Sequence, residues 1–251
     1  MRKTLDGQAI DSEAIDFIQQ NEPADVGYTL GFSGGKDSCV VFDLVQRAGV
    51  KFKAIYHNTT VDPPQLIQNM KENYPSVQIV NPTYTMWELI VKKGFLPTRQ
   101  IRFCCDYLKE GRGTTTDSNL ITGVRAAESR KRSTQPRIGR YRKIQQFRPI
   151  LSWSDNDVWS YIHERELKFC SLYLEGFKRL GCIGCPMTGR AQVKFEFEFF
   201  PKQRLMWLHA AERLFDAGKV DRFNSGQAYF EHWVEQRKLS NQCQFSMFDE
   251  A

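Results

Sequence analysis

The segment Ser33-Gly34-Gly35-Lys36-Asp37-Ser38 combines groups suited to binding a polyphosphate. Its two glycines let the backbone approach an anion closely, and Lys36 adds a positive charge. Amide groups at the start of the following helix would face the same anion. The hydroxyls of Ser33 and Ser38 can bind phosphate oxygens, and Asp37 can hold Mg²⁺ directly or through water. The spacing is not that of a Walker A loop, and the combination disfavours a mere glycine-rich turn with a capping aspartate.

Five of the seven cysteines could act together on a metal. Cys182 and Cys185 form a CxxC pair, Cys104 and Cys105 are adjacent, and Cys170 precedes Cys182 by twelve residues. Four thiolates gathered from loops suit a [4Fe–4S] cluster or a structural Zn²⁺. The sequence predicts that four of these five bind the metal and leaves open which four.

The positive charge of the chain is concentrated in residues 125–148, which hold nine basic residues and one acidic residue. The whole chain of 251 residues carries a net charge of +6, and the remainder outside this stretch carries 26 basic and 28 acidic residues. A localised positive segment attracts polyanions, either nucleotide phosphates or nucleic acid. A non-enzymatic DNA-binding module is therefore one hypothesis, although the intact phosphate loop argues against it.

The elements that must position these groups alternate along the first half of the chain. Apolar patterns predict strands at 27–32, 52–58, 77–81 and 119–123, and helices at 12–20, 38–47, 64–74 and 86–93. This alternation predicts an α/β fold, a parallel twisted sheet with helices on both faces. We expect residues 126–148 to form a largely exposed loop, and 146–150 a last strand or extended segment.

The second half is expected to be mostly helical, with helices at 158–166, 201–217 and 228–239. We therefore expect a nucleotide-binding domain at 1–153 and a helical C-terminal portion carrying the CxxC at 154–251. No apolar run approaches the ~18 residues of a membrane span, and the N-terminus lacks the apolar core of a signal peptide. We expect a cytoplasmic protein without membrane contact.

The loop SGGKDS between a strand and a helix resembles that of the PP-loop ATP pyrophosphatase superfamily, the adenine nucleotide alpha hydrolase-like fold. Its members cleave ATP between the α- and β-phosphates and adenylate an acceptor. An ordered series of further motifs resembles the phosphoadenosine-phosphosulfate (PAPS) reductase-like branch, over roughly residues 25–190. That series comprises Leu96-Pro97-Thr98-Arg99, Arg102-Phe103-Cys104-Cys105 with Lys109, Thr122-Gly123-Val124-Arg125, Pro149-Ile150 with Trp153, Val158-Trp159 and Gly181-Cys182-Ile183-Gly184-Cys185-Pro186.

This resemblance implies a set of site residues. Catalysis would fall to Lys36, Asp37, Ser38 and Arg125, with Asp37 as the Mg²⁺ ligand. ATP would contact Ser33, Gly34, Gly35, Lys36, Asp37, Ser38, His57, Asn58, Gly123, Arg125 and Arg130. Adenylyl-sulfate reductases of the branch hold one [4Fe–4S] cluster with a CC pair and a downstream CxxC. Here Cys170 adds a fifth candidate, and Zn²⁺ is the alternative metal.

Two chemistries of the branch remain to be distinguished. The reductases lack the lysine of the loop and carry a nucleophilic cysteine in a C-terminal E-C-G-x-H motif. Cys243, in Asn241-Gln242-Cys243-Gln244, has neither the Glu nor the Gly and His of that motif. The sequence therefore favours ATP cleavage, with PAPS or adenylyl-sulfate reduction as the alternative.

The nearest functional analogue is the ATP pyrophosphatase subunit of bacterial DNA phosphorothioation systems. The analogy implies a nucleic acid acceptor bound through 125–148 and a sulfur-donor protein such as a cysteine desulfurase. A tRNA thiolation enzyme is a further alternative. The segment 244–248, Gln-Phe-Ser-Met-Phe, resembles peptides that bind the bacterial sliding clamp, although the sequence favours a tail packed on its own domain.

Overall fold

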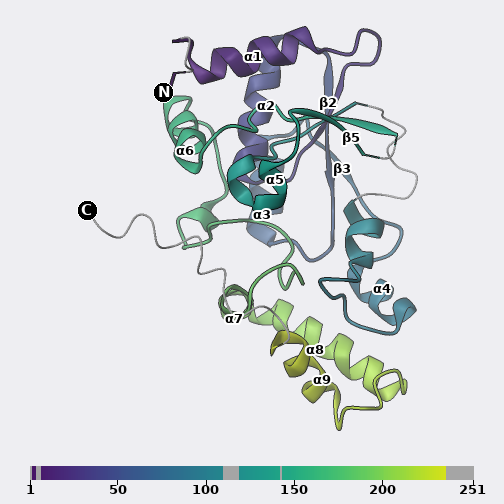
Figure 1. Ribbon diagram of the computed structural model, residues 1–251. Helices are drawn as coiled ribbons and strands as arrows, with labels where there is room; N and C mark the ends of the chain where they lie inside the picture. Colours follow the sequence, from purple (N-terminus) through teal and green to yellow (C-terminus); the bar gives the residue numbers. More distant parts are fainter. Residues whose placement is uncertain (1, 4–6, 110–118, 142, 236–251) are drawn as a thin grey trace. The chain divides into compact units, whose positions relative to one another are not determined.

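The computed structural model describes residues 2–3, 7–109, 119–141 and 143–235 (Figure 1). The chain divides into two compact units. The first comprises residues 1–57, 64–80 and 113–180, and the second comprises 58–63, 81–112 and 181–251. This division differs from the expected boundary at residue 153, because the chain leaves the first unit twice before returning to it.

The first unit is built on a six-stranded sheet with strand order β3-β2-β1-β4-β6-β5. Five strands are parallel, and β5 pairs with β6 antiparallel at the edge. The strands are β1 (Tyr28–Gly31), β2 (Phe52–His57), β3 (Gln78–Val80), β4 (Asn119–Ile121), β5 (Ile138–Tyr141) and β6 (Ile144–Phe147). The predicted α/β fold with a mostly parallel sheet is confirmed.

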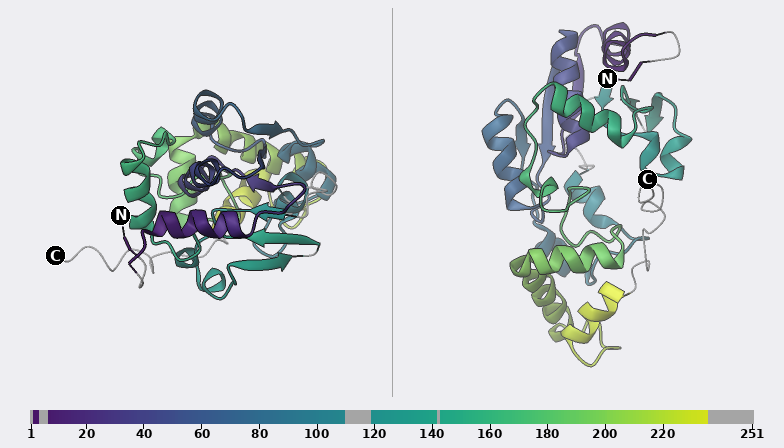
Figure 2. Two further views of the ribbon diagram at one scale, coloured as in Figure 1. Left: turned by 90° about the horizontal axis from the view of Figure 1, so that it is seen from above. Right: turned by 90° about the vertical axis from the view of Figure 1, so that its left-hand side faces the viewer.

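Helices cover this sheet. They are α1 (Ile10–Gln20), α2 (Lys36–Ala48), α3 (Pro64–Asn73), α5 (Arg130–Ser133) and α6 (Asp155–Glu164). Consecutive residues of β1, Tyr28, Thr29 and Leu30, are all buried, so both faces of the central strand are covered. The helices α1, α2 and α6 lie side by side (Figures 1 and 2) and share one apolar core with β1 and β2.

Residues 126–148 are not the exposed loop that the sequence predicts. They form a short 3₁₀-helix (Ala126–Glu128), helix α5 and the antiparallel hairpin β5–β6. The hairpin extends the sheet beyond β4, and Phe147 of β6 packs edge-on against Tyr28 of β1. Most residues of β5 are exposed, so the strand lacks the apolar pattern by which sequence reasoning finds strands.

The second unit is mostly helical. It contains α4 (Met86–Lys93), a π-helical turn (Cys105–Lys109), α7 (Arg190–Phe199), α8 (Pro201–Asp216) and α9 (Gly226–Glu235). Trp207 is fully buried and stacks on Trp233, with ring centroids 4.8 Å apart. The Trp207 indole N–H donates to the carbonyl of Ile183, between the two cysteines of the CxxC, at 3.1 Å. The tryptophan core of this unit therefore fixes the CxxC loop.

Gly184 lies within that loop in the left-handed region, at φ +72°. A Cβ there would lie 2.7 Å from the Trp207 indole nitrogen, so only glycine fits. Within the described ranges, no helix has the length and apolar character needed to cross a bilayer.

Candidate functional site

The loop Ser33–Ser38 lies where the strand order of the sheet reverses. From β1 the chain proceeds to β2 and β3 on one side, and then to β4 and β6 on the other. Because β1 and β4 are parallel neighbours, the segments that follow them meet at one edge of the sheet. Open α/β sheets bind their ligands at such switch points. The loop after β1 and the segment Gly123–Arg125 after β4 are thus brought together, as the motifs predict.

Two glycines allow this close approach. Gly34 has φ +72°, and a Cβ on it would lie 2.8 Å from a methyl carbon of Leu66 in α3. A Cβ on Gly123 would lie 2.8 Å from the backbone of Asp37. Larger residues at either position would push the loop away from its neighbours.

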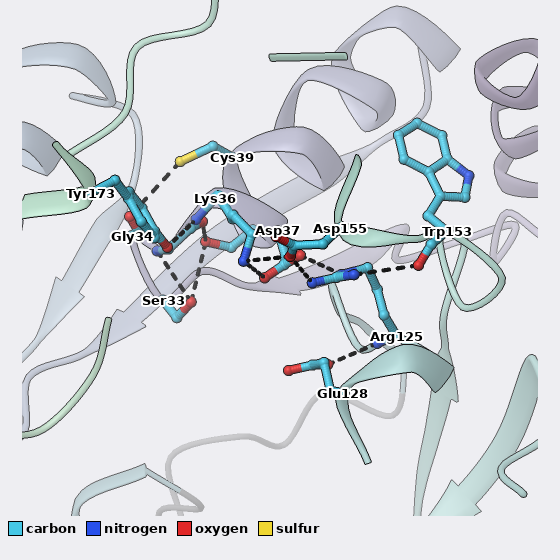
Figure 3. A network of polar contacts seen from close by, with 12 residues as sticks. Ser33, Gly34, Lys36, Asp37, Cys39, Arg125, Glu128, Trp153, Asp155 and Tyr173 are labelled. Atoms are coloured by element: carbon cyan, nitrogen blue, oxygen red, sulfur yellow. Dashed lines mark hydrogen bonds and ion pairs between the residues drawn. The ribbon is translucent and has the colours of Figure 1, made fainter. Parts of the chain in front are cut away.

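Four charged side chains point toward one another beside the loop (Figure 3). The Nε of Arg125 donates to Asp37 Oδ1 at 2.5 Å, and another guanidinium nitrogen donates to Asp155 Oδ1 at 2.9 Å. The same Asp155 oxygen lies 3.1 Å from Lys36 Nζ, while Asp37 Oδ2 lies 3.7 Å from Lys36 Nζ. We call Lys36, Asp37, Arg125 and Asp155 the charge cluster.

The cations of the charge cluster are enclosed, and one of its carboxylates faces solvent. The side chains of Lys36 and Arg125 are 6% and 4% exposed, whereas that of Asp155 is 62% exposed. Burial by itself would lower the pKa of Arg125, but Asp37 and Asp155 outweigh it and the pKa is raised. The Arg125 guanidinium therefore stays charged, and Asp155 is the member of the charge cluster most exposed to solvent.

The charge cluster has a net charge of zero and alternates in sign. A magnesium–pyrophosphate complex also alternates positive and negative groups. Its phosphate oxygens can replace the carboxylates as partners of Lys36 and Arg125, and its Mg²⁺ can bind the carboxylate of Asp37. The arrangement is therefore suited to binding a metal–polyphosphate complex by exchange of partners.

Hydrogen bonds shape the loop itself. Ser38 Oγ lies 3.2 Å from Ser33 Oγ and donates to the carbonyl of Gly35 at 2.8 Å. The backbone N–H of Lys36, the first residue of α2, donates to the hydroxyl of Tyr173 at 2.9 Å. The two predicted serines are thus hydrogen-bonded within the loop, and Tyr173 binds the loop from outside it.

Three further predicted ATP-binding residues, His57, Asn58 and Arg130, are not members of the charge cluster. His57 ends β2, and burial lowers its pKa, so the imidazole is neutral at physiological pH and is suited to a nucleoside more than to a phosphate. Arg130 is exposed at the start of α5. Asn58 belongs to the second unit, where its side chain donates to Asn81 Oδ1 at 2.9 Å and accepts from the Thr60 N–H.

Sequence reasoning missed Asp155 and Tyr173 as site residues. Asp155 belongs to a helix-start signal, and the capping box of Ser154 and Asp157 indeed starts α6 there. That signal gives its place on the helix but not its contact with Lys36. Tyr173 lies 137 residues from Lys36 in the sequence, and no sequence motif marks it as a site residue.

The basic segment 125–148 divides into two groups of residues. Four arginines bind partners within the protein. Arg125 belongs to the charge cluster, and Arg132 pairs with Glu128. Arg137 pairs with Glu13, and Arg148 donates to the carbonyl of Pro136. Arg130, Lys131, Arg140 and Lys143 are exposed, with no ion pair among the described residues. Arg142 lies outside the described residues. The surface charge is thus smaller than the sequence count implies.

The candidate metal ligands also separate into two groups. In the second unit, Cys104 interacts with Cys105 through a hydrogen bond and electrostatically with Cys182 and Cys185, and these contacts together with burial raise its pKa. Cys170 lies in the first unit, fully buried and near Cys39. Cys170 thus lies in a different unit from the other four candidates, which all belong to the second unit.

Lys109 lies beside the CxxC pair. The proximity of Cys182 raises the pKa of this lysine, while burial raises the pKa of the Cys182 thiol to about 12. Among the residues that the structure describes, no three or more His, Cys, Asp or Glu side chains are grouped so as to hold a metal ion. The four thiols are thus neighbours without forming a ready metal site. Cys243 and the segment 244–248 lie outside the described residues.

A protein family can now be assigned from comparison with known sequences. The model of the phosphoadenosine phosphosulfate reductase domain matches residues 27–188, which include both the loop and the CxxC. The chain belongs to this family. The match confirms the resemblance to the PAPS reductase-like branch that the motifs indicate.

Relatives of the family differ in how much of their length they share with this chain. An uncharacterized protein of Methanocaldococcus jannaschii is 30% identical over 197 residues, 72% of this chain and 47% of that protein. An adenosine 5'-phosphosulfate reductase of Oceanobacillus iheyensis is 26% identical over 186 residues, 69% of this chain and 76% of that protein. The chain spans less than half the length of the M. jannaschii proteins it matches.

Solved structures share the fold at low identity. A PAPS reductase of Candida auris in complex with phosphate superposes with a TM-score of 0.54 at 18% identity, covering 71% of this chain and 90% of that one. An FMN adenylyltransferase of Candida glabrata, in complex with FAD and pyrophosphate, gives 0.50 at 16% identity, covering 69% and 61%. Both nucleotide-using enzymes share the α/β architecture described above.

Proposed function

We propose that the protein is a PP-loop ATP pyrophosphatase that binds Mg·ATP at the charge cluster. It would cleave ATP to AMP and pyrophosphate and transfer the adenylyl group to an acceptor. The observation that carries this proposal is the buried Lys36 at the start of α2, facing Arg125, Asp37 and Asp155. A lysine at this point suits the β- and γ-phosphates, which the sulfonucleotides lack.

The proposed reaction assigns a role to each member of the charge cluster. An oxygen of the acceptor attacks the α-phosphorus, the bond from that phosphorus to the α–β bridging oxygen breaks, and pyrophosphate leaves. Lys36 and Arg125 neutralise the charge that develops on the departing pyrophosphate. Asp37, released from Arg125 by the incoming phosphates, fits Mg²⁺ because its carboxylate is a hard oxygen ligand. Ser33 and Ser38 donate to phosphate oxygens.

The proposed acceptor is nucleic acid, in a sulfur-incorporation reaction such as DNA phosphorothioation. Adenylation would turn a backbone phosphate oxygen into a leaving group, and a sulfur nucleophile from a donor protein such as a cysteine desulfurase would displace AMP. Arg130, Lys131, Arg140 and Lys143 support this proposal, because their exposed charges are available to a polyanion. Thiolation of tRNA uses the same steps with a different acceptor.

Reversing charges on the exposed bases tests the acceptor. In the double variant Lys131→Glu and Arg140→Glu, we expect nucleic-acid stimulation of pyrophosphate release to fall about tenfold or more at moderate salt. Release without nucleic acid should be unchanged, because neither residue contacts the charge cluster. The measurement compares duplex DNA, tRNA and no nucleic acid.

The matched control is Lys71→Glu with Lys168→Glu, which changes the charge equally at exposed positions elsewhere in the first unit. Equal stimulation in both double variants would contradict nucleic acid binding through the basic segment. Whichever nucleic acid stimulates the unaltered protein identifies the acceptor class.

The cysteines of the second unit support a metal cofactor. We propose that Cys104, Cys105, Cys182 and Cys185 hold a [4Fe–4S] cluster, with Zn²⁺ as the alternative, because four thiols provide the donors that either metal group requires. When bound, such a group would supply structural stability or electron transfer. This proposal leaves out Cys170, which lies in the first unit.

Metal content after purification without oxygen tests this assignment. Cys182→Ser should lose most of the bound iron and sulfide, or zinc, while Cys170→Ser should retain it. The assay is iron, acid-labile sulfide and zinc per chain. Metal loss in Cys170→Ser equal to that in Cys182→Ser, or no metal in the unaltered protein, would show the assignment to be wrong.

A further inference from the structure

Tyr173 places a hydroxyl group directly at the phosphate loop. It ends a 3₁₀ turn, Ser171–Tyr173, and its oxygen lies 2.9 Å from the backbone nitrogen of Lys36. A Cβ on Gly35 would lie 3.4 Å from the same oxygen. The hydroxyl therefore accepts a hydrogen bond at the N-terminus of α2, where an anion bound by the loop would otherwise accept it.

The ring that carries this hydroxyl is held by aromatic neighbours. Trp159 of α6 packs edge-on against Tyr173, with centroids 5.2 Å apart at 88°, and Phe169 lies edge-on at 6.4 Å. The Lys36 ammonium lies 5.7 Å from the centre of the Tyr173 ring. Tyr173 thus contacts Lys36 twice, with its hydroxyl at the backbone N–H and with its ring at the ammonium.

The hydroxyl has a proton to donate. Its oxygen is occupied as an acceptor by the Lys36 N–H, and in the described part of the chain no group accepts its own proton. Burial raises the pKa of Tyr173 well above its ordinary value, so the phenol stays protonated at any working pH. A protonated donor beside Lys36 faces the region in which the charge cluster would receive phosphate.

We propose that the Tyr173 hydroxyl is a further pyrophosphate-binding group, donating to an oxygen of the β- or γ-phosphate while it accepts from the Lys36 amide. This inference rests on the proposed function, which places those phosphates at the loop. The Lys36 N–H would then bind the Tyr173 oxygen, and the Tyr173 O–H would bind the phosphate. Tyr173 thereby links the second half of the chain to the phosphate loop.

Removing the hydroxyl alone tests the proposal. Tyr173→Phe keeps the ring and its contacts with Trp159, and it should weaken binding of inorganic pyrophosphate by about 10- to 100-fold, as expected for the loss of a hydrogen bond to a charged group. Binding of AMP, which lacks the β- and γ-phosphates, should be unchanged. A purely structural role would weaken both ligands alike. Both affinities are measured by isothermal titration calorimetry.

Tyr161→Phe is the matched control. The Tyr161 hydroxyl also accepts from an N–H, that of Arg47, and it donates to Asp43, but it is not part of the charge cluster. Pyrophosphate affinity should be unchanged in this variant. Unchanged or tighter pyrophosphate binding in Tyr173→Phe would overturn the proposal, the latter showing that the hydroxyl merely occupies the site.

Two results separate this inference from the proposed function. If the unaltered protein cleaves ATP to AMP and pyrophosphate and Tyr173→Phe binds pyrophosphate equally well, the inference fails and the function stands. If no ATP is cleaved but pyrophosphate binding still falls in Tyr173→Phe, the binding role stands and the function fails. If the unaltered protein binds no pyrophosphate, both fail.

Discussion

Lys36→Ala should reduce pyrophosphate release from Mg·ATP by at least about 100- to 1,000-fold, the range lost when one preorganised charge-stabilising group is removed from an active site. The reason lies in the charge cluster. Without Lys36 its net charge changes from zero to −1, so it repels the triphosphate and no longer neutralises the leaving pyrophosphate. The fold should persist, because Arg125 still pairs with both Asp37 and Asp155.

Rates of AMP and pyrophosphate formation, together with a thermal unfolding curve, measure this effect. Lys168→Ala is the control, an exposed lysine in the same unit that does not contact the charge cluster. Pyrophosphate release retained in Lys36→Ala would refute the assignment of the loop as the catalytic phosphate site. Loss of the folded state would make Lys36→Met, which keeps most of the buried stem, the variant to measure.

Arg125→Ala should affect both activity and stability. Its guanidinium is buried and donates to Asp37, to Asp155 and, at 3.4 Å, to the carbonyl of Trp153. Its loss leaves Lys36 as the one remaining ion-pair partner of Asp37 among the described residues, and we expect the free energy of unfolding to fall by on the order of 3 kcal/mol. ATP binding should also weaken, because the charge cluster again becomes net negative.

Urea unfolding and ATP titration of the same preparation measure these two effects. Arg125→Lys restores the charge but not the planar fork that reaches several oxygens, so it should recover part of the ATP affinity and little of the stability. Arg137→Ala is the control, because Arg137 also binds a carboxylate, Glu13, and a carbonyl, that of Pro149, without contacting the charge cluster. Comparable loss of ATP affinity in Arg137→Ala would contradict a specific role for Arg125.

Much of the sheet could be predicted because its strands are buried and apolar. The segment 52–58 and the helix at 86–93 match β2 and α4 closely. Strand β5 was missed because it is exposed at the edge and carries polar residues, whereas the strand or extended segment expected at 146–150 overlaps the end of β6. The boundary at residue 153 also differs from the division in the structure, since segment 81–112, which carries α4, belongs to the second unit although it lies between β3 and β4 in the sequence.

The site was predictable where its residues directly follow predicted strands. The phosphate loop and Gly123–Arg125 both follow predicted strands, and parallel strands bring their ends together. Asp155 and Tyr173 reach Lys36 from more than 100 residues away, so their roles depend on how α6 and the turn after it pack. The number of basic residues over 125–148 also overestimates the exposed positive charge, because ion pairs such as Arg137–Glu13 form only in the folded chain.

Analysis of the products formed from α-labelled ATP tests the central claim most directly. Protein purified without oxygen is incubated with Mg²⁺ and the labelled ATP, with and without DNA or tRNA. Our proposal predicts labelled AMP, free or on the acceptor, and an equal amount of pyrophosphate. No cleavage under any of these conditions, with sulfite formed from PAPS or adenylyl-sulfate instead, would contradict it and establish the reductase reaction.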